Sequence, residues 1–176
     1  MKTAVFGGGC FWCTEAIFQM LKGVSKVESG YAGGKMDNPS YEQVSTGDTG
    51  HAEVIRVTYD PAVISYEDLL TVFFGSHDPT TPNRQGADVG EQYRSVILYG
   101  SDEERVTAER VSKEIQESLK DGSRVVTQII PLEQFFPAES YHQNYFKENT
   151  NVPYCQIVIE PKIEKVKKRF AELVKQ

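Results

Sequence analysis

The sequence predicts a mixed α/β (α+β) fold, in which one sheet is covered by helices as a two-layer sandwich. Three observations predict this class. The chain has 176 residues, the length of a single domain. Strand-like segments alternate along the chain with helix-like segments, in which apolar residues recur every three or four positions. No internal repeat or low-complexity stretch interrupts that order.

The first part of the chain predicts a strand, a helix and a second strand. Residues 3–8 (TAVFGG) are typical of a short strand that ends in glycines. Residues 14–22 predict a helix with apolar side chains on one side, at Ile17, Phe18, Met20 and Leu21. Residues 23–34 predict a strand that closes on a Gly-rich turn. Residues 31–50 are rich in Gly, Pro, Ser and Tyr, so we expect a long loop, and such loops are often functional.

The middle of the chain repeats the strand-and-helix pattern. Residues 52–60 (AEVIRVTYD) alternate cleanly and predict a strand. Ser65, with Asp68 three residues later, resembles a helix N-cap, and the helix is expected to run to Gly75. Residues 76–94 predict a second long polar loop.

The last part predicts two more strands and three helices. Residues 95–100 and 124–132 are strand-like, and Ser101 with Glu104 predicts a capping box before a helix. That helix carries a stripe at four-residue spacing, formed by Val111, Ile115 and Leu119. Residues 141–149 suggest a short helix. Pro161 opens a final helix whose apolar face holds Ile163, Val166, Phe170 and Leu173. Two βαβ-like halves in this order suit a ferredoxin-like plait.

The composition narrows the class of protein. A net charge of −6 argues against a nucleic-acid partner, and no apolar run approaches the length of a membrane span. The first ten residues lack the apolar core of a secretory signal. The three cysteines are too few, and odd in number, for a secreted disulfide framework. We therefore expect a cytoplasmic protein whose cysteines serve redox or metal chemistry.

The stretch GGGCFWCTE, residues 7–15, is the strongest chemical signal. Cys10 follows three glycines at a helix entrance, where free N–H groups and the helix dipole favour a thiolate. Cys13 lies on the same helix face, so the pair can cycle between dithiol and disulfide. Inert structural cysteines are one alternative. Zinc is another, but it needs four ligands, and the histidines are scattered singly, at His51, His77 and His142.

The two residues between the cysteines are aromatic. Phe11 and Trp12 beside a thiolate form an apolar wall suited to an apolar or sulfur-containing group. A pair of core aromatics is the alternative interpretation.

Several motifs together carry a resemblance to a known family. They are GGGCFWCTEAIF, GYAGG, NPSYEQV, TGHAEVIRVTYDP, HDPTT, RQGADVGEQYRS and YHQNY, which span residues 4 to about 160. With these motifs the chain resembles the A-type peptide methionine sulfoxide reductases. The motifs are long and specific and cover nearly the whole chain.

The resemblance implies a reaction and a set of site residues. Cys10 matches the nucleophile that attacks the sulfoxide sulfur and becomes a sulfenic acid, and Glu53 matches the acid that protonates the oxygen. It also implies oxygen-binding and substrate-binding residues, which are Tyr41, Tyr93, Asp88, Phe11 and Trp12. It implies action on the S epimer of methionine sulfoxide, free or in oxidised proteins, as a repair reaction.

The chain differs from many relatives of that family in the cysteines that would regenerate the reduced Cys10 thiol. Position 13 is often Gly in the family and is Cys13 here, while Cys155 in NVPYCQIV matches a C-terminal family cysteine. Some relatives have Cys where this chain has Ser45. We expect Cys13 to resolve the Cys10 sulfenic acid first and Cys155 to act second. Thioredoxin or a similar external dithiol would then reduce the disulfide.

The resemblance also bounds the wider setting. We expect residues 1–176 to be one catalytic domain, with residues 150–176 as a C-terminal segment that carries Cys155 and the last helix. We expect a monomer with no bound cofactor and no metal, since no dinucleotide or Walker A motif is present. A general thiol–disulfide oxidoreductase remains an alternative, and so does a non-enzyme, either a sulfoxide-peptide binding module or a zinc protein.

Overall fold

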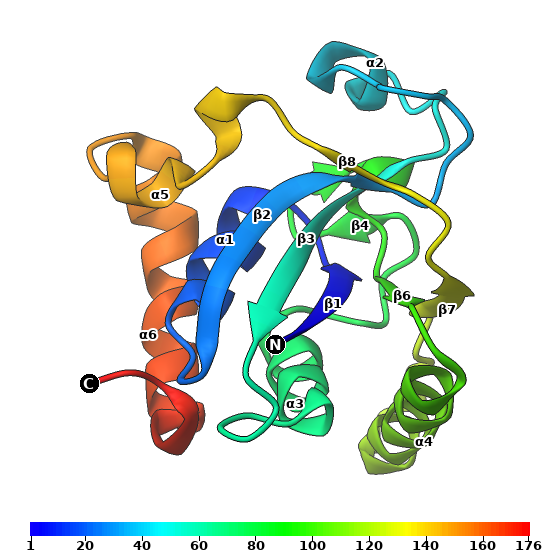
Figure 1. The fold of residues 1–176 in the computed structure, drawn as a ribbon, viewed down its shortest axis with the longest axis vertical. Helices are drawn as coiled ribbons and strands as arrows, with labels where there is room; N and C mark the ends of the chain where they lie inside the picture. The colour runs from blue at the N-terminus through cyan, green and yellow to red at the C-terminus, as the bar shows by residue number, and fades with distance from the viewer.

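A six-stranded sheet forms the centre of the computed structural model, which describes residues 1–176. Its strand order is β7-β6-β1-β3-β2-β8 (Figure 1). All neighbouring strands are antiparallel except β6 and β7, which run parallel. The strands, in chain order, are β1 (Lys2–Gly7), β2 (Val24–Ala32), β3 (Ala52–Tyr59), β6 (Val96–Tyr99), β7 (Gln128–Pro131) and β8 (Phe135–Pro137). A separate two-stranded hairpin is formed by β4 (Arg84–Gln85) and β5 (Asp88–Val89).

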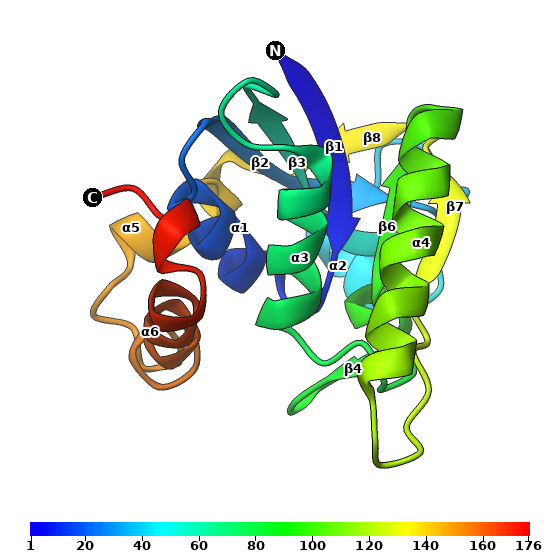
Figure 2. The same ribbon diagram turned by 90° about the horizontal axis from the view of Figure 1, so that it is seen from below.

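Helices cover one face of the sheet. Helix α1 packs on β2 and β3, and α3 lies between α4 and α6 (Figure 2). The α-helices are α1 (Phe11–Gln19), α2 (Tyr41–Ser45), α3 (Tyr66–Ser76), α4 (Asp102–Ser118), α5 (Tyr145–Glu148) and α6 (Glu160–Arg169). The short 3₁₀ turns are η1 (Glu91–Tyr93), η2 (Ser140–His142) and η4 (Ala171–Leu173), and η3 (Cys155–Ile159) is a π-helical segment that runs into α6. No helix has both the length and the apolar character that crossing a membrane requires.

The main core lies between the helices and the sheet. Phe6 of β1 is fully buried, and its ring packs against those of Phe18, Tyr66 and Phe73 at centroid distances of 5.6, 6.0 and 5.2 Å. The opposite face of the sheet carries a smaller buried cluster, made of Val5, Ala32, Ala52, Val54, Val96 and Leu98. Successive side chains of β1 therefore point to opposite faces of the sheet, with Phe6 in the main core and Val5 in the smaller cluster.

The mixed α/β class is confirmed, while the ferredoxin-like plait stays a prediction. Ser65 and Asp68 form the expected complete capping box at the start of α3. The cap of α4 differs from the expectation. Ser101 accepts from the Glu104 N–H, but the Glu104 carboxylate accepts from the Gly100 N–H at 3.0 Å instead of closing the box.

Several element boundaries were wrong in the sequence analysis. Helix α1 begins at Phe11, three residues before the expected start, because the Cys10 carbonyl already accepts from the Cys13 N–H. The strand expected over residues 124–132 is shorter, since the Val126 N–H bonds the Pro79 carbonyl and not a strand neighbour. Leu119 lies just past the end of α4. The expected loops contain the unpredicted elements α2, β4, β5 and β8.

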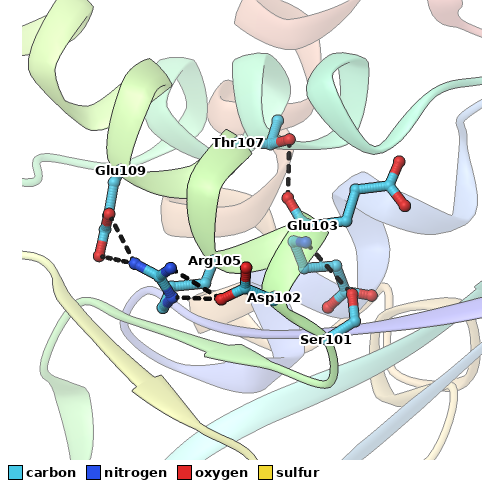
Figure 3. Close-up of polar contacts among 7 residues, drawn as sticks. Ser101, Asp102, Glu103, Arg105, Thr107 and Glu109 are labelled. Carbon is cyan, nitrogen blue, oxygen red and sulfur yellow. Dashed lines mark hydrogen bonds and ion pairs between the residues drawn. The ribbon is translucent and has the colours of Figure 1, made fainter.

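Charged side chains form ion pairs on the exposed surface at the start of α4. Arg105 bonds Asp102 at 2.7 Å and Glu109 at 3.1 Å, one turn away on either side (Figure 3). Such exposed pairs contribute little to stability. Helix α4 is therefore attached to the sheet mainly through its buried residues Ala108 and Val111.

Candidate active site

Cys10 lies at the junction between β1 and α1. It is the N-cap residue of α1, and its carbonyl accepts from the N–H groups of Cys13 and Thr14 at 3.1 and 3.4 Å. The preceding Gly9 has φ +95°, and a Cβ there would come within 2.8 Å of the Gln85 side chain. The turn that presents the thiol therefore needs glycine at this position.

Glu53 reaches the same helix start from β3. Its Oε1 accepts a hydrogen bond from the Phe11 backbone N–H at 3.1 Å. The side chain is buried, and this burial raises the pKa of Glu53 to about 8, against the opposing effect of the Phe11 N–H. The carboxyl group is therefore mostly protonated at neutral pH, with Oε2 free of protein partners as the site of its proton.

The two N-terminal thiols titrate as a pair. A hydrogen bond between the two side chains, followed by burial and the charge of Glu53, raises the pKa of Cys10 well above its ordinary value. The same hydrogen bond lowers the pKa of Cys13 to about 7, and the Lys162 ammonium adds to this effect. Within the pair, the hydrogen bond between the two side chains favours Cys13 as the thiol that loses its proton first, whereas the helix N-terminus by itself favours Cys10.

Aromatic rings surround Trp12. Its indole stacks on Tyr145 at a centroid distance of 3.7 Å, and its Nε1–H donates to His142 Nδ1 at 3.0 Å. Phe11 is buried and lies against Tyr31 and His142. Phe11 thus has the core packing of the alternative interpretation, whereas half-buried Trp12 keeps part of its ring accessible.

The two site tyrosines come from the two long loops. Tyr41 opens α2, and its ring lies 4.5 Å from that of His142. Tyr93 ends η1. Burial, followed by the charge of Glu53, raises the pKa of both hydroxyls. Both phenols therefore stay protonated at neutral pH, as hydrogen-bond donors near the Glu53 carboxyl group.

Two further residues hold these loops in place. Glu139 accepts from the Tyr41 N–H and from the Tyr31 hydroxyl, each at 2.9 Å, and so ties α2 to β2. Arg94 donates to the carbonyls of Gly50 and Glu91 at 2.9 and 3.1 Å, which joins the two long loops beside Tyr93.

Asp88 lies on β5 and contacts the C-terminal segment. Its Oδ2 accepts from the Tyr154 hydroxyl at 3.1 Å. The same hydroxyl is 3.7 Å from Cys13 Sγ, and Lys162 Nζ is 3.8 Å from that sulfur. Asp88 is thus connected to the Cys13 thiol through Tyr154.

Cys155 is the least accessible of the three free thiols. It is fully buried at the start of η3, which packs against α1. Burial raises its pKa, and Cys13 is the next contributor. Burial and the raised pKa thus keep the Cys155 thiol unreactive in this structure.

Sequence reasoning missed several residues of this site. The motif YHQNY contains His142 and Tyr145, and only their contacts with Trp12 reveal their place. Glu15 is buried in α1 and accepts from the Tyr145 N–H at 3.2 Å and from Ser29 Oγ at 3.2 Å. No local pattern marked Lys162, which lies 149 positions from Cys13 in the chain. No group of three or more metal-ligating side chains is found.

Comparison with known proteins gives one family throughout. The family model for peptide methionine sulfoxide reductase matches residues 2–174. The peptide methionine sulfoxide reductase MsrA of Sulfolobus acidocaldarius is 54% identical, over 98% of this chain and 97% of that protein.

Solved structures of yeast Mxr1 are similar as well. The reduced form of Mxr1 from Saccharomyces cerevisiae has a TM-score of 0.81 at 38% identity, over 88% of each chain. Mxr1 in complex with Trx2 has a TM-score of 0.58 at 28% identity, over 82% of this chain and 84% of that one.

Proposed function

The chain belongs to the peptide methionine sulfoxide reductase family and is an oxidoreductase of this kind, and we propose that it reduces the S epimer of methionine sulfoxide through Cys10, with Glu53 as the acid. One observation carries the proposal. The protonated carboxyl group of Glu53 is held at the first N–H of α1, one residue from the Cys10 thiol.

The substrate is placed by the aromatic wall and the tyrosines. The methyl group and sulfur lie against the accessible part of Trp12, because apolar and sulfur-containing groups favour aromatic surfaces, and buried Phe11 supports the site through its contact with His142. The sulfoxide oxygen then points to Glu53, with the hydroxyls of Tyr41 and Tyr93 as additional donors.

The first step moves the oxygen from the substrate to Cys10. Cys10 passes its proton to the Cys13 thiolate and attacks the sulfoxide sulfur, while Glu53 protonates the oxygen. The new bond between Cys10 Sγ and the substrate sulfur then breaks together with the sulfur–oxygen bond of the substrate, as the hydroxyl group transfers to Cys10. Methionine leaves and Cys10 becomes a sulfenic acid, so the thiol is oxidised by the two electrons that the sulfoxide gains.

Cys13 then forms a disulfide with Cys10. Its pKa of about 7 supplies a thiolate at neutral pH, and it is adjacent to Cys10 on the helix. Cys155 acts second, after the segment around η3 moves, because its thiol is buried in the resting protein. An external thioredoxin restores the dithiol, and the complex of the similar Mxr1 with Trx2 supports this partner.

The remaining features of the proposal concern the setting. We infer that residues 1–176 act as one catalytic domain and as a cytoplasmic monomer, with no bound cofactor. Asp88 contributes to substrate binding through Tyr154. The biological role is repair of oxidised methionine in proteins.

Turnover of separated epimers tests this proposal. The enzyme is given the two epimers of N-acetyl methionine sulfoxide with dithiothreitol, as the wild type and as Cys10→Ser. Consumption of the S epimer alone, lost in Cys10→Ser, is the expected result. Disulfide exchange without consumption of either epimer would instead favour a general thiol–disulfide oxidoreductase.

A further inference from the structure

Two groups from the C-terminal segment converge on one sulfur atom. Lys162 Nζ is 3.8 Å from Cys13 Sγ, and the Tyr154 hydroxyl is 3.7 Å from it. We propose that Lys162 and Tyr154, with Asp88 behind Tyr154, form an activating unit that holds Cys13 as a thiolate for attack on oxidised Cys10. The inference rests on the proposed resolving role of Cys13.

Lys162 supplies the positive charge. It lies on the first turns of α6, is half-buried, and directs its ammonium at the sulfur. The same ammonium has no carboxylate within salt-bridge distance, unlike Lys167 on the next turns, which pairs with Glu164. A nearby ammonium is an established way to favour a thiolate over a thiol.

Tyr154 supplies a route for the proton. A phenol has one proton to donate, and Tyr154 donates it to Asp88 at 3.1 Å. Its oxygen can therefore accept the S–H of the Cys13 thiol, and the proton passes through Tyr154 to Asp88. Once Cys13 is a thiolate, the Tyr154 hydroxyl donates to its sulfur, which lowers the pKa of Cys13. Asp88 acts only through Tyr154, so it is a positioning residue for this step.

The cation is needed because the other neighbours are acidic. Asp88 raises the pKa of Cys13, and the facing groups Cys10, Glu53 and Cys155 carry no positive charge. Lys162 is the one cation that faces the sulfur and lowers its pKa. Loss of this ammonium would leave the thiolate with no facing cation, held only by the hydrogen bonds from Cys10 and Tyr154.

The step itself balances without another reactant. The Cys13 thiolate attacks the sulfur of the Cys10 sulfenic acid, the S–S bond forms, and the S–O bond breaks. Hydroxide leaves and takes the proton that Cys13 released, so the net products are a disulfide and one water. Cys10 sulfur is reduced while Cys13 sulfur is oxidised.

A single-turnover experiment without reductant separates the two steps. A Cys155→Ala background isolates Cys13, and quenched samples are analysed for methionine and for the Cys10–Cys13 disulfide. The sole tryptophan, Trp12, lies between the two cysteines and provides a fluorescence signal for disulfide closure. Lys162→Met is compared with Lys162→Arg, with Tyr154→Phe and with Lys165→Met, an exposed lysine on the same helix.

The expected result is a slower second step, with a smaller slowing of the first step, in which the Cys13 thiolate only accepts the Cys10 proton. In Lys162→Met, closure at pH 7 slows about tenfold, more than methionine formation does, and its pH midpoint rises by about one unit. Lys162→Arg restores most of the rate, and Tyr154→Phe slows closure as well. The proposal would be overturned if the rate of disulfide closure in Lys162→Met equalled that in Lys165→Met at every pH. If Lys162→Met does not fold, Lys162→Gln provides the same comparison.

Other outcomes identify which part of the account fails. No methionine from the wild type would refute the reductase chemistry itself. Methionine without a Cys10–Cys13 disulfide would refute the resolving role of Cys13, and the activating unit with it. If Lys162→Met forms methionine and closes the Cys10–Cys13 disulfide at normal rates, the activating unit is refuted while the proposed function stands.

Discussion

Glu53 Oε1 accepts the backbone N–H of Phe11 at 3.1 Å, so the carboxyl group of β3 caps the helix that Cys10 begins. The bond fixes the acid relative to the nucleophile through the backbone, not through a mobile side chain. Burial keeps the same group protonated at neutral pH. Glu53 and Cys10, the proposed acid and nucleophile, are therefore held together by β1, α1 and β3.

Replacing this acid should impair the first step. In Glu53→Gln the hydrogen bond from Phe11 is retained but no proton is available, so methionine formation should fall by about 10²- to 10⁴-fold. Rapid-quench measurement of methionine in a single turnover checks this. Glu91→Gln, an exposed carboxyl group on η1, is the control, and an equal loss in both variants would argue against the assignment.

The same substitution should stabilise the protein at neutral pH. The unfolded Glu53 ionises near pH 4.5, but the folded group ionises near 8, so wild-type stability is lost as the pH rises between these values. Above pH 8 the cost of ionising the buried Glu53 is about 5 kcal/mol, which Gln avoids. Urea unfolding of wild type and Glu53→Gln at pH 5 and pH 8.5 measures the difference. A gap that does not widen with pH would contradict the raised pKa.

Glu15 should control substrate binding through Tyr145. Its carboxylate accepts the Tyr145 N–H, and Tyr145 stacks on Trp12. In Glu15→Gln the side-chain amide has only one oxygen, so it cannot accept hydrogen bonds from both the Tyr145 N–H and the Ser29 hydroxyl. KM should therefore rise by about three- to tenfold, which is more than kcat falls. Glu148→Gln on the exposed side of α5 is the control. A fall in kcat with KM unchanged would exclude this positioning role.

Arg94 should matter more for stability than an exposed arginine. Arg94→Met removes bonds to Gly50, Glu91 and Gln128 and should lower the free energy of unfolding by about 2–4 kcal/mol. Arg105→Met, which removes only the exposed pairs at the start of α4 (Figure 3), should lower the free energy of unfolding much less, because exposed ion pairs contribute little. Chemical denaturation compares the two. Similar losses would show that the buried bonds add nothing.

The features predicted correctly from the sequence are those that depend on residues close together in the chain. The glycines, the C-x-x-C spacing and the helix start are encoded within residues 7–15, and Ser65 with Asp68 encodes its own cap. The ionisation of the thiols differs from the expectation, because the hydrogen bond between Cys10 and Cys13, burial, Glu53 on β3 and Lys162 in the C-terminal segment act together with the helix N-terminus. No local pattern marks Glu53, which the family resemblance indicated and whose burial only the structure shows.

Contacts between distant segments could not be predicted from periodicity. Lys162 is separated from Cys13 by 149 positions, and Tyr154 by 141, so no spacing rule connects them. Helix α2 was read as loop because its five residues are too few for a periodic pattern. Its position depends on Glu139, which follows the last strand of the sheet.

The pH dependence of methionine formation in a single turnover tests the central claim most directly. Without reductant, the wild-type rate should rise as the thiol pair ionises near pH 7 and fall as Glu53 loses its proton near pH 8. In Glu53→Gln the falling limb should disappear and the remaining rate should be low. A wild-type rate that stays constant from pH 7 to pH 9.5 would contradict Glu53 as the acid.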